Sequence, residues 1–379
     1  MGLTFAMGND GGVSETIDEA PLSLLERPPS RAANVMAATG LTASLIIALL
    51  TVIPSRYAIQ EPGPTYDTLA TVDGLSLVEI EGAPTYDSSG ELRLTTVSVL
   101  RGGSQKFTVG SVIAAFFSPA STVTPEETVF GDAADEEADK EASAQQWISS
   151  QESATVSALE ARGTVVPATI TVAEVMDTSH AVDLLQPEDV LVAGDGVDFV
   201  SYADLTAFLE GHLPGDTITL TVSRAGEKLD VDFALIGSEG DAKMGIYVDP
   251  SFDLPIDVTV GIDQVGGPSA GLMFALAIMD RLSPEDELDG ALVAGTGQID
   301  ADGEIYPIGG IAHKLYGARA AGAEYFLAPV ENCAEVVGHV PDGLSVYAVD
   351  QLDDAYAAMV AIGEHDTAGL PTCSADDNE

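Results

Sequence analysis

The longest apolar stretch in the sequence runs from Ala32 to Ile53 and contains no charged side chain in 22 positions. A helix rises about 1.5 Å per residue, so this stretch matches the ~30 Å hydrocarbon core of a bilayer. A cleaved signal sequence is the alternative interpretation. The residues that follow, Pro54-Ser55-Arg56-Tyr57, contain no small-x-small cleavage site, so the pattern favours an uncleaved transmembrane signal anchor over residues 32–53.

Basic residues flank this span unequally, with Arg27 and Arg31 before it and Arg56 after it. The excess before the span predicts a cytoplasmic N-terminus. Residues 1–31 are polar and acidic and contain proline, which predicts a disordered cytoplasmic tail. We therefore expect a single-pass protein of the cell membrane whose remaining domains are extracytoplasmic.

Strand-like alternation of apolar and polar residues resumes at 76–80 and 91–99, and a short apolar helix is expected at 109–117. An acidic run and a helix-forming stretch follow. We interpret residues 57–162 as a juxtamembrane α+β section with an acidic loop and a helix, and with no chemistry of its own.

Residues 165–236 predict a further small domain. In chain order, its expected elements are strands at 168–172 and 174–176, a small-residue helix position at 180–185, an amphipathic helix at 201–209 and a strand at 217–224. This order of elements resembles a PDZ domain, and the turn from Gln186 to Gly196 resembles a PDZ turn with Glu188 in place of glycine. The resemblance implies binding of extended C-terminal peptides at a sheet edge. A rigid spacer or an oligomerisation contact is the alternative.

Composition narrows the function classes. Hydrophobic residues make up 46% of the chain, which supports folded cores. The 61 acidic and 14 basic residues give a formal net charge of -47, so a basic footprint for nucleic acid is absent and no nucleic-acid partner is expected. The acidic surface is interpreted as a solvated surface.

Cysteine and histidine spacing predicts neither a metal nor a cofactor. Cys333 and Cys373 form no CxxC pair, and the five histidines form no HExxH-like pair. A disulfide would be compatible with an oxidising compartment, but the sequence gives no sign of one, so we expect two unpaired thiols.

Residues 239–362 carry the pattern with the most chemical content. A strand at 258–262 and a glycine-rich loop precede a helix expected from Ser269 to Leu282. Ser269 then stands at a helix N-terminus, where unpaired amides favour negative charge and could stabilise an oxyanion. Its candidate supporting residues are Gly267, Pro268 and Ala270. An ordinary N-cap is the alternative role for a serine at this position.

A second block places Lys314 one turn into another expected helix, after Gly309-Gly310. Lys314 adjoins an apolar face that includes Ile311 and Leu315. Free lysine has a pKa of about 10.4, and burial must lower it to about 7–8 before the amine can act as a base at neutral pH. His313 points to a different face of the helix, so a Ser–Lys pair is favoured over a Ser–His pair.

At these blocks the sequence closely resembles the proteolytic domain of the Lon family. Gly267 to Gly271 match its "G-P-S-A-G" motif, Thr296 to Lys314 match "T-G-x-I…G…P-I-G-G-I-x-x-K", and a third block ends at Asn332. Pro62-Gly63-Pro64-Thr65-Tyr66 matches the motif after the span in membrane-anchored, PDZ-containing Lon-type peptidases of Gram-positive bacteria. The resemblance covers roughly residues 30–362.

This resemblance implies that Ser269 is the nucleophile, that Lys314 is the general base, and that Thr296 supports them by hydrogen-bonding Lys314. Gly267 and Gln298 stand where ATP-dependent Lon enzymes often have Asp and Glu, a departure that the PDZ-linked branch tolerates. The sequence contains no Gly-x-x-x-x-Gly-Lys-[Ser/Thr] loop, so we expect activity without ATP.

We therefore predict an α/β (α+β) multidomain fold with a transmembrane helix, a small α+β section, a PDZ-like domain and a Lon-type proteolytic domain, followed by a disordered acidic tail at 363–379. The predicted function is an ATP-independent serine endopeptidase for extended or unfolded polypeptides. The resemblance also implies a homo-oligomer. The alternative is a peptide-binding membrane adaptor with a silent or self-cleaving Lon-like domain.

Overall fold

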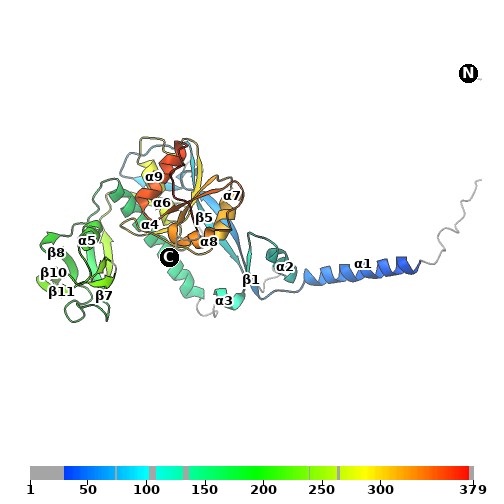
Figure 1. Ribbon diagram of the computed structural model, residues 1–379, viewed down its shortest axis with the longest axis horizontal. Coiled ribbons are helices and arrows are strands. Elements are labelled where there is room, and N and C mark those ends of the chain that lie inside the picture. The colour runs from blue at the N-terminus through cyan, green and yellow to red at the C-terminus, as the bar shows by residue number, and fades with distance from the viewer. Residues whose placement is uncertain are drawn as a thin grey trace, which may run out of the picture.

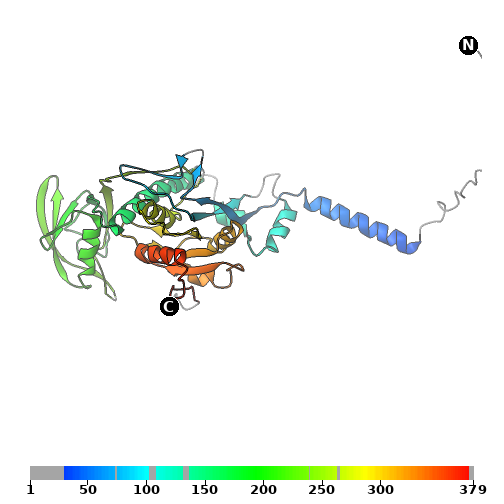
Figure 2. The ribbon, with the colours of Figure 1, turned by 90° about the horizontal axis from the view of Figure 1, so that it is seen from above.

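The computed structural model describes residues 30–72, 75–101, 108–130, 136–238, 240–262 and 265–374. Almost all of the expected N-terminal tail, part of the acidic run and residues 375–379 lie outside this described part. A projecting helix, a central head (residues 54–162 and 253–374) and a β-rich lobe (residues 165–252) follow one another along the molecule (Figures 1 and 2).

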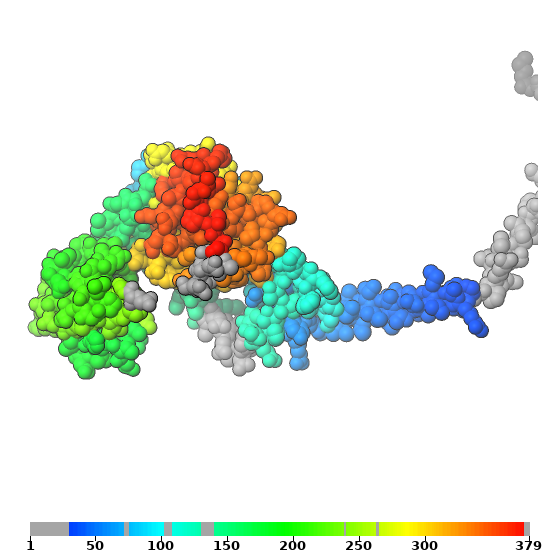
Figure 3. Space-filling model, in the orientation of Figure 1, coloured from blue at the N-terminus to red at the C-terminus, as the bar shows by residue number. Residues whose placement is uncertain are grey.

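The projecting helix is α1 (Arg31–Leu50). Ser30 caps it by accepting a hydrogen bond from the Ala33 N–H, and none of its residues is buried. Figure 3 shows it extending away from the head as an uncovered rod. With a mean hydropathy of 1.8, α1 is long and apolar enough to cross a membrane, and it is the one such helix among the described residues. The helix ends at Leu50, earlier than the expected Ile53.

The head is built on a six-stranded sheet in the order β20-β19-β16-β5-β1-β6. The strands are β1 (Tyr57–Asp67), β5 (Glu91–Leu100), β6 (Thr122–Pro125), β16 (Leu292–Gly295), β19 (Tyr325–Pro329) and β20 (Ser345–Val349). Strands β5, β16, β19 and β20 are parallel, whereas β1 pairs antiparallel with both β5 and β6. The expectation of a separate juxtamembrane section is therefore wrong, because β5 pairs directly with β16 of the proteolytic part.

Alternation along the strands divides the interior of the head into two cores. Val293 and Leu327 join one core with α4 (Glu136–Ala161), α6 (Gly271–Arg281) and α9 (Leu352–Gly363). Ala294 and Phe326 join the other core with α7 (Ile311–Ala320) and α8 (Cys333–Val336). Successive side chains of a strand point to opposite faces, so the sheet lies between two helical layers.

Shorter elements complete the head. They are β2 (Thr71–Val72), β3 (Leu75–Ser76), β4 (Val78–Glu81), α2 (Val109–Phe116), α3 (Glu126–Phe130), β15 (Asp257–Val260), β17 (Gln298–Ile299), β18 (Ile305–Tyr306) and the 3-10 turn η2 (Val330–Asn332). The helix expected at 109–117 is confirmed by α2. The helix expected to begin at Ser269 is α6, which begins two residues later.

The lobe is inserted into the head between α4 and β15, and β15 pairs back with β4 of the head. Its main sheet has the order β11-β10-β8-β7-β14, with β9 paired to β8. The elements are β7 (Ala168–Val175), β8 (Val190–Gly194), β9 (Val197–Asp198), α5 (Tyr202–Glu210), β10 (Thr217–Arg224), β11 (Glu227–Ala234), β12 (Ile236–Ser238), β13 (Asp241–Lys243) and β14 (Ile246–Phe252).

The expected end of this domain at residue 236 was too early. Strand β14 pairs antiparallel with β7 along its whole length, and Ala242 and Met244 are buried in the same core as Ile170 and Leu220. The boundary was missed because β14 stands close in sequence to the strand that opens the next part of the head.

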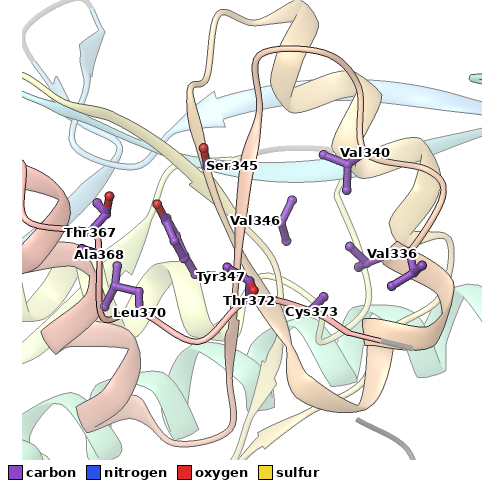
Figure 4. A pocket seen from close by; sticks show the side chains of 11 residues that line it. Val336, Val340, Ser345, Val346, Tyr347, Thr367, Ala368, Leu370, Thr372 and Cys373 are labelled. Atoms are coloured by element: carbon purple, nitrogen blue, oxygen red, sulfur yellow. The ribbon is translucent and has the colours of Figure 1, made fainter. Parts of the chain in front are cut away.

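The C-terminal segment corrects two further expectations (Figure 4). Cys333 and Cys373 form a disulfide, where two unpaired thiols were expected. The Ala348 N–H donates to the Pro371 carbonyl, and Leu370 packs against the head core. Pro371 and Thr372 therefore lie along the outer edge of β20, and the described part of the expected tail, residues 363–374, is packed on the head. The remaining residues of that tail lie outside the described part.

Replacing Cys373 by serine should lower the free energy of unfolding by about 3–4 kcal/mol, because the covalent link spans 40 positions and restricts the unfolded chain. Urea denaturation can be followed by the fluorescence of Trp147, which is buried against Phe274 in the head core. Reductant should shift the wild-type midpoint by the same amount and leave the Cys373→Ser midpoint unchanged. Equal midpoints for the two proteins under oxidising conditions would contradict the prediction.

Candidate active site

Ser269 lies in the turn that joins the loop after β15 to α6. The N-cap residue of α6 is Ala270, and no side chain caps the helix. Ser269 is only half-buried, and its hydroxyl lies 2.8 Å from Nζ of Lys314. The ordinary N-cap role is therefore wrong for this serine. Its side chain faces another residue's amine instead of its own helix.

Lys314 comes from α7, on the opposite helical layer, and its side chain is only 3% exposed. Its Nζ donates to the hydroxyl oxygens of Ser269 and Thr296, both at 2.8 Å. Burial lowers the pKa of this amine from 10.5 to about 7. At neutral pH a large fraction of Lys314 is therefore uncharged, with a lone pair that can accept a proton.

Thr296 closes the arrangement from the loop after β16. It is fully buried, and its hydroxyl donates to the Ser269 carbonyl at 2.9 Å while its oxygen accepts from Lys314. One hydroxyl thus fixes the backbone of Ser269 and the amine of Lys314 at the same time. The structure brings together all three residues that the sequence singled out at separate places in the chain.

The loop before α7 is held by contacts that set the direction of Lys314. Gly310 caps the helix in the left-handed region with φ of 71°. The Asn332 side chain accepts from the Ile308 N–H and donates to the Ile308 carbonyl, both at 2.9 Å. Asn332 appeared in the sequence only as the end of a matching block. Its paired hydrogen bonds show that it positions the approach to α7.

His313 is directed away from Ser269 and Lys314. Its Nδ1 contacts the Ala120 carbonyl at 2.9 Å, and the ring is 5% exposed. This contact agrees with the expectation that Lys314, and not His313, faces Ser269.

The turn around Ser269 is braced by α4, which no motif had indicated. The Gly267 N–H donates to the Ser143 carbonyl at 3.0 Å, and the Ser150 hydroxyl donates to the Pro268 carbonyl at 3.1 Å. The N–H of Gly267 is therefore engaged, and Pro268 has no N–H, so neither residue offers a free amide to an oxyanion. Among the hydrogen bonds of the described residues, none uses the N–H of Ser269 or Ala270. These two amides remain as candidate oxyanion donors.

A groove of about 490 Å³ opens beside Ser269 and Lys314. One wall is β5 from Thr95 to Leu100, and the other includes Gly266, Ala270 and Gly309. Strand β5 pairs with β16 only as far as Leu94, whereas residues 97–100 pair with β1 on the other side alone. The described strands thus leave one backbone edge of β5 unpaired next to Ser269, which is the arrangement that accepts an added strand.

The described residues contain no group of three or more His, Cys, Asp or Glu side chains arranged to hold a metal ion. The groups that the structure places at this site are a hydroxyl, a buried amine and backbone amides.

Comparison with known proteins gives a family match at this part of the chain. Residues 239–361 match the Lon protease (S16) C-terminal proteolytic domain. Lon protease 1 of Sorangium cellulosum is 33% identical over 153 residues, covering 35% of this chain and 19% of that protein. Lon protease of Campylobacter jejuni is 32% identical over 192 residues, covering 47% and 22%. The chain thus spans about a fifth of the length of these relatives.

Solved structures similar to part of the chain are PDZ domains of SdrC-like proteins. The domain from Listeria monocytogenes is 23% identical with a TM-score of 0.20, covering 21% of this chain and 86% of that chain. The domain from Listeria innocua is 21% identical with a TM-score of 0.20, covering 21% and 92%.

Proposed function

We propose that this protein is a serine endopeptidase in which Ser269 is the nucleophile and Lys314 the general base. The observation that carries the proposal is the 2.8 Å contact between Ser269 Oγ and a lysine amine that is 3% exposed and has a pKa of about 7. The match of residues 239–361 to a proteolytic domain supports it. A buried neutral amine next to a hydroxyl is a recognised means of activating a nucleophile.

In the first step, the Ser269 hydroxyl proton moves to Lys314 Nζ while Oγ bonds to the carbonyl carbon of the substrate. The amides of Ser269 and Ala270 stabilise the resulting oxyanion. The C–N bond then breaks, and Lys314 gives its proton to the leaving amine. In the second step, Lys314 takes a proton from water, the hydroxide attacks the acyl ester, and Ser269 leaves with that proton. The two steps consume one water and restore both side chains.

The substrate is proposed to be an extended polypeptide. A chain that adds to the free edge of β5 at residues 97–100 passes directly beside Ser269. A folded protein buries its backbone groups and cannot present such a segment, so unfolded or flexible chains are favoured.

Hydrolysis is proposed to proceed without ATP, because the sequence contains no Gly-x-x-x-x-Gly-Lys-[Ser/Thr] loop. The test is incubation of the purified protein with unfolded fluorescent casein in the absence of nucleotide. Peptide release is the expected result. Intact casein over a range of pH and salt would favour the alternative of a binding adaptor, and fragments of the protein alone would favour self-cleavage.

The lobe is proposed to bind polypeptide C-termini as a PDZ-like domain. A hollow of about 420 Å³ lies between α5 and β14, lined by Leu205 and Leu209 on one side and Ile246 and Val248 on the other. Strand β14 is the last strand of its sheet, and its residues 246–248 line this hollow. A peptide can add to the outer edge of this strand and place its apolar side chains against α5.

Replacing Leu209 by serine should weaken binding of an apolar C-terminal peptide by about tenfold, because burying a leucine contributes on the order of 1.5 kcal/mol. Fluorescence anisotropy of a labelled peptide measures the affinity. Leu213→Ser is the matched control, since Leu213 is 62% exposed and does not line the hollow. Equal affinities for the two variants would place the peptide elsewhere.

The proposal places the protein in the cell membrane through α1, with the head and lobe outside the cytoplasm and assembled as a homo-oligomer. The length and composition of α1 support the anchor. Resistance to alkaline carbonate extraction tests the anchor, protease protection in sealed vesicles tests the side, and mass photometry in detergent tests the assembly. Release of the protein by carbonate would contradict the anchor. Protection or digestion of the head and lobe opposite to that expected for an extracytoplasmic position would contradict the side. A single monomeric mass would contradict the assembly.

A further inference from the structure

A compact apolar face lies at the base of α1. Phe116 at the end of the short helix α2 and its C-cap residue Phe117 are 75% and 80% exposed, and Ile113 within α2 is 43% exposed. The two phenyl rings contact each other edge to face, with centroids 5.7 Å apart. No charged residue occurs between Lys106 and Glu126, although the chain contains 61 acidic residues. Exposed apolar side chains gathered in this way mark an interaction site.

The face adjoins the end of the apolar helix. The Val109 N–H donates to the Ile53 carbonyl at 3.0 Å, and Pro54 bridges to Thr108. A Cβ on Gly110 would lie 3.2 Å from the Leu50 carbonyl oxygen, so the two backbones are in close contact. Figures 1 to 3 show α2 at the end of α1 that meets the head.

The length of α1 sets the depth of this contact. Its 20 residues, at about 1.5 Å each, equal the ~30 Å hydrocarbon core. When α1 spans that core, Leu50 lies at the boundary with the lipid head groups. Because α2 contacts Leu50 and Ile53, it lies at that same boundary, where aromatic side chains are favoured.

We propose that α2 is an interfacial membrane helix that inserts Phe116, Phe117 and Ile113 between the lipids beside α1. The proposal rests on the proposed anchoring by α1. A second copy of the chain is the competing occupant of this face. The continuity of the face with α1 favours lipid, and its lack of charge removes the repulsion that the acidic surface would exert on anionic lipids.

This seating would hold the active site close to the membrane surface. The segment after α2 contacts α7 through the Ala120 carbonyl and His313, the residue before Lys314. Next, β6 pairs with β1, which together with β5 borders the groove. Polypeptides that emerge from the bilayer or lie on it would therefore reach the groove before chains in free solution.

The test uses the full-length protein with a new tryptophan at the face, F117W, in vesicles of phosphatidylcholine with brominated acyl chains. Brominated chains quench a tryptophan that touches them. Trp147 is 9% exposed in the head core and serves as the internal reference. The matched control is V197W, because Val197 is 60% exposed in the lobe. I113W provides a second position on α2.

The emission of each new tryptophan is the emission of the variant minus that of the wild type. For F117W and for I113W we expect this emission to be at least about twofold lower in brominated than in unbrominated vesicles, and for V197W we expect no loss. Flotation of the protein with vesicles reports the α1 anchor separately. The interfacial seating would be overturned if the protein floats normally but F117W and I113W are quenched no more than V197W. That outcome would leave the α1 anchor intact. An unquenched face whose substitutions also reduce the oligomer mass would assign it to a second copy and overturn the proposal.

Discussion

Cleavage of unfolded casein should fall by about 10⁴-fold or more when Ser269 is replaced by alanine, because the acyl-ester pathway loses the atom that forms the covalent bond. The fold should persist, since Ser269 does not cap α6 and is only half-buried. The measurement is the initial rate of fluorescent peptide release, with matching near-ultraviolet circular dichroism of the two proteins.

Ser157→Ala is the control for this experiment. Ser157 is 3% exposed on α4, and within the described part of the chain its hydroxyl bonds only to the Ala154 carbonyl of the same helix. Loss of this hydroxyl should leave the cleavage rate within about threefold of the wild-type rate. One neutral hydrogen bond contributes only roughly 1 kcal/mol to the stability of the fold. Full activity of Ser269→Ala would remove this serine as the nucleophile and direct attention to another site in the chain.

Replacing Lys314 by methionine should abolish cleavage to a similar extent, because Ser269 then loses the only amine within hydrogen-bond distance among the described residues. In the wild type, kcat/KM should rise with pH about tenfold per unit up to the amine's pKa of about 7 and level off above it. Only the uncharged amine accepts the serine proton, which sets the direction of this profile. Lys228→Met, at an exposed position, should leave rate and profile unchanged.

Stability provides a separate check that Lys314→Met has not simply unfolded. The pKa of Lys314 is about 7 in the folded protein and 10.5 when exposed, so between these values the unfolded chain binds more protons. Wild-type stability should therefore rise with pH across this window, and the rise should be smaller in Lys314→Met. A methionine variant that is less stable than wild type at pH 7 would contradict burial as the cause of the lowered pKa.

The two residues proposed to react could be found in the sequence because each stands in a short local pattern. Glycines and a following apolar helix mark Ser269, and a second glycine pair and helix mark Lys314. Local patterns specify local elements, so α1, α2, α6 and α7 were expected close to where they lie. The same reasoning could not show which strands pair, because pairing depends on contacts between residues far apart in the chain.

Several features of the site therefore required the tertiary structure. Ser143 and Ser150 lie on a helix that precedes the lobe, yet they brace the turn next to Ser269. No spacing rule links them to that turn, because the whole lobe intervenes. The same holds for the amide of Gly267, because only its contact with Ser143 of α4 shows that this N–H is engaged.

The sequence by itself was sufficient to find the apolar span, to single out Ser269, Lys314 and Thr296 as candidate site residues, and to show the excess of acidic residues. The tertiary structure decided the strand partners of β5, the disulfide that fastens the C-terminal segment, and the burial that lowers the pKa of Lys314. The physical reason for this division is the distance along the chain over which each kind of information acts. Composition and periodicity act over a few residues, whereas burial and hydrogen-bond pairing arise only when distant segments pack together.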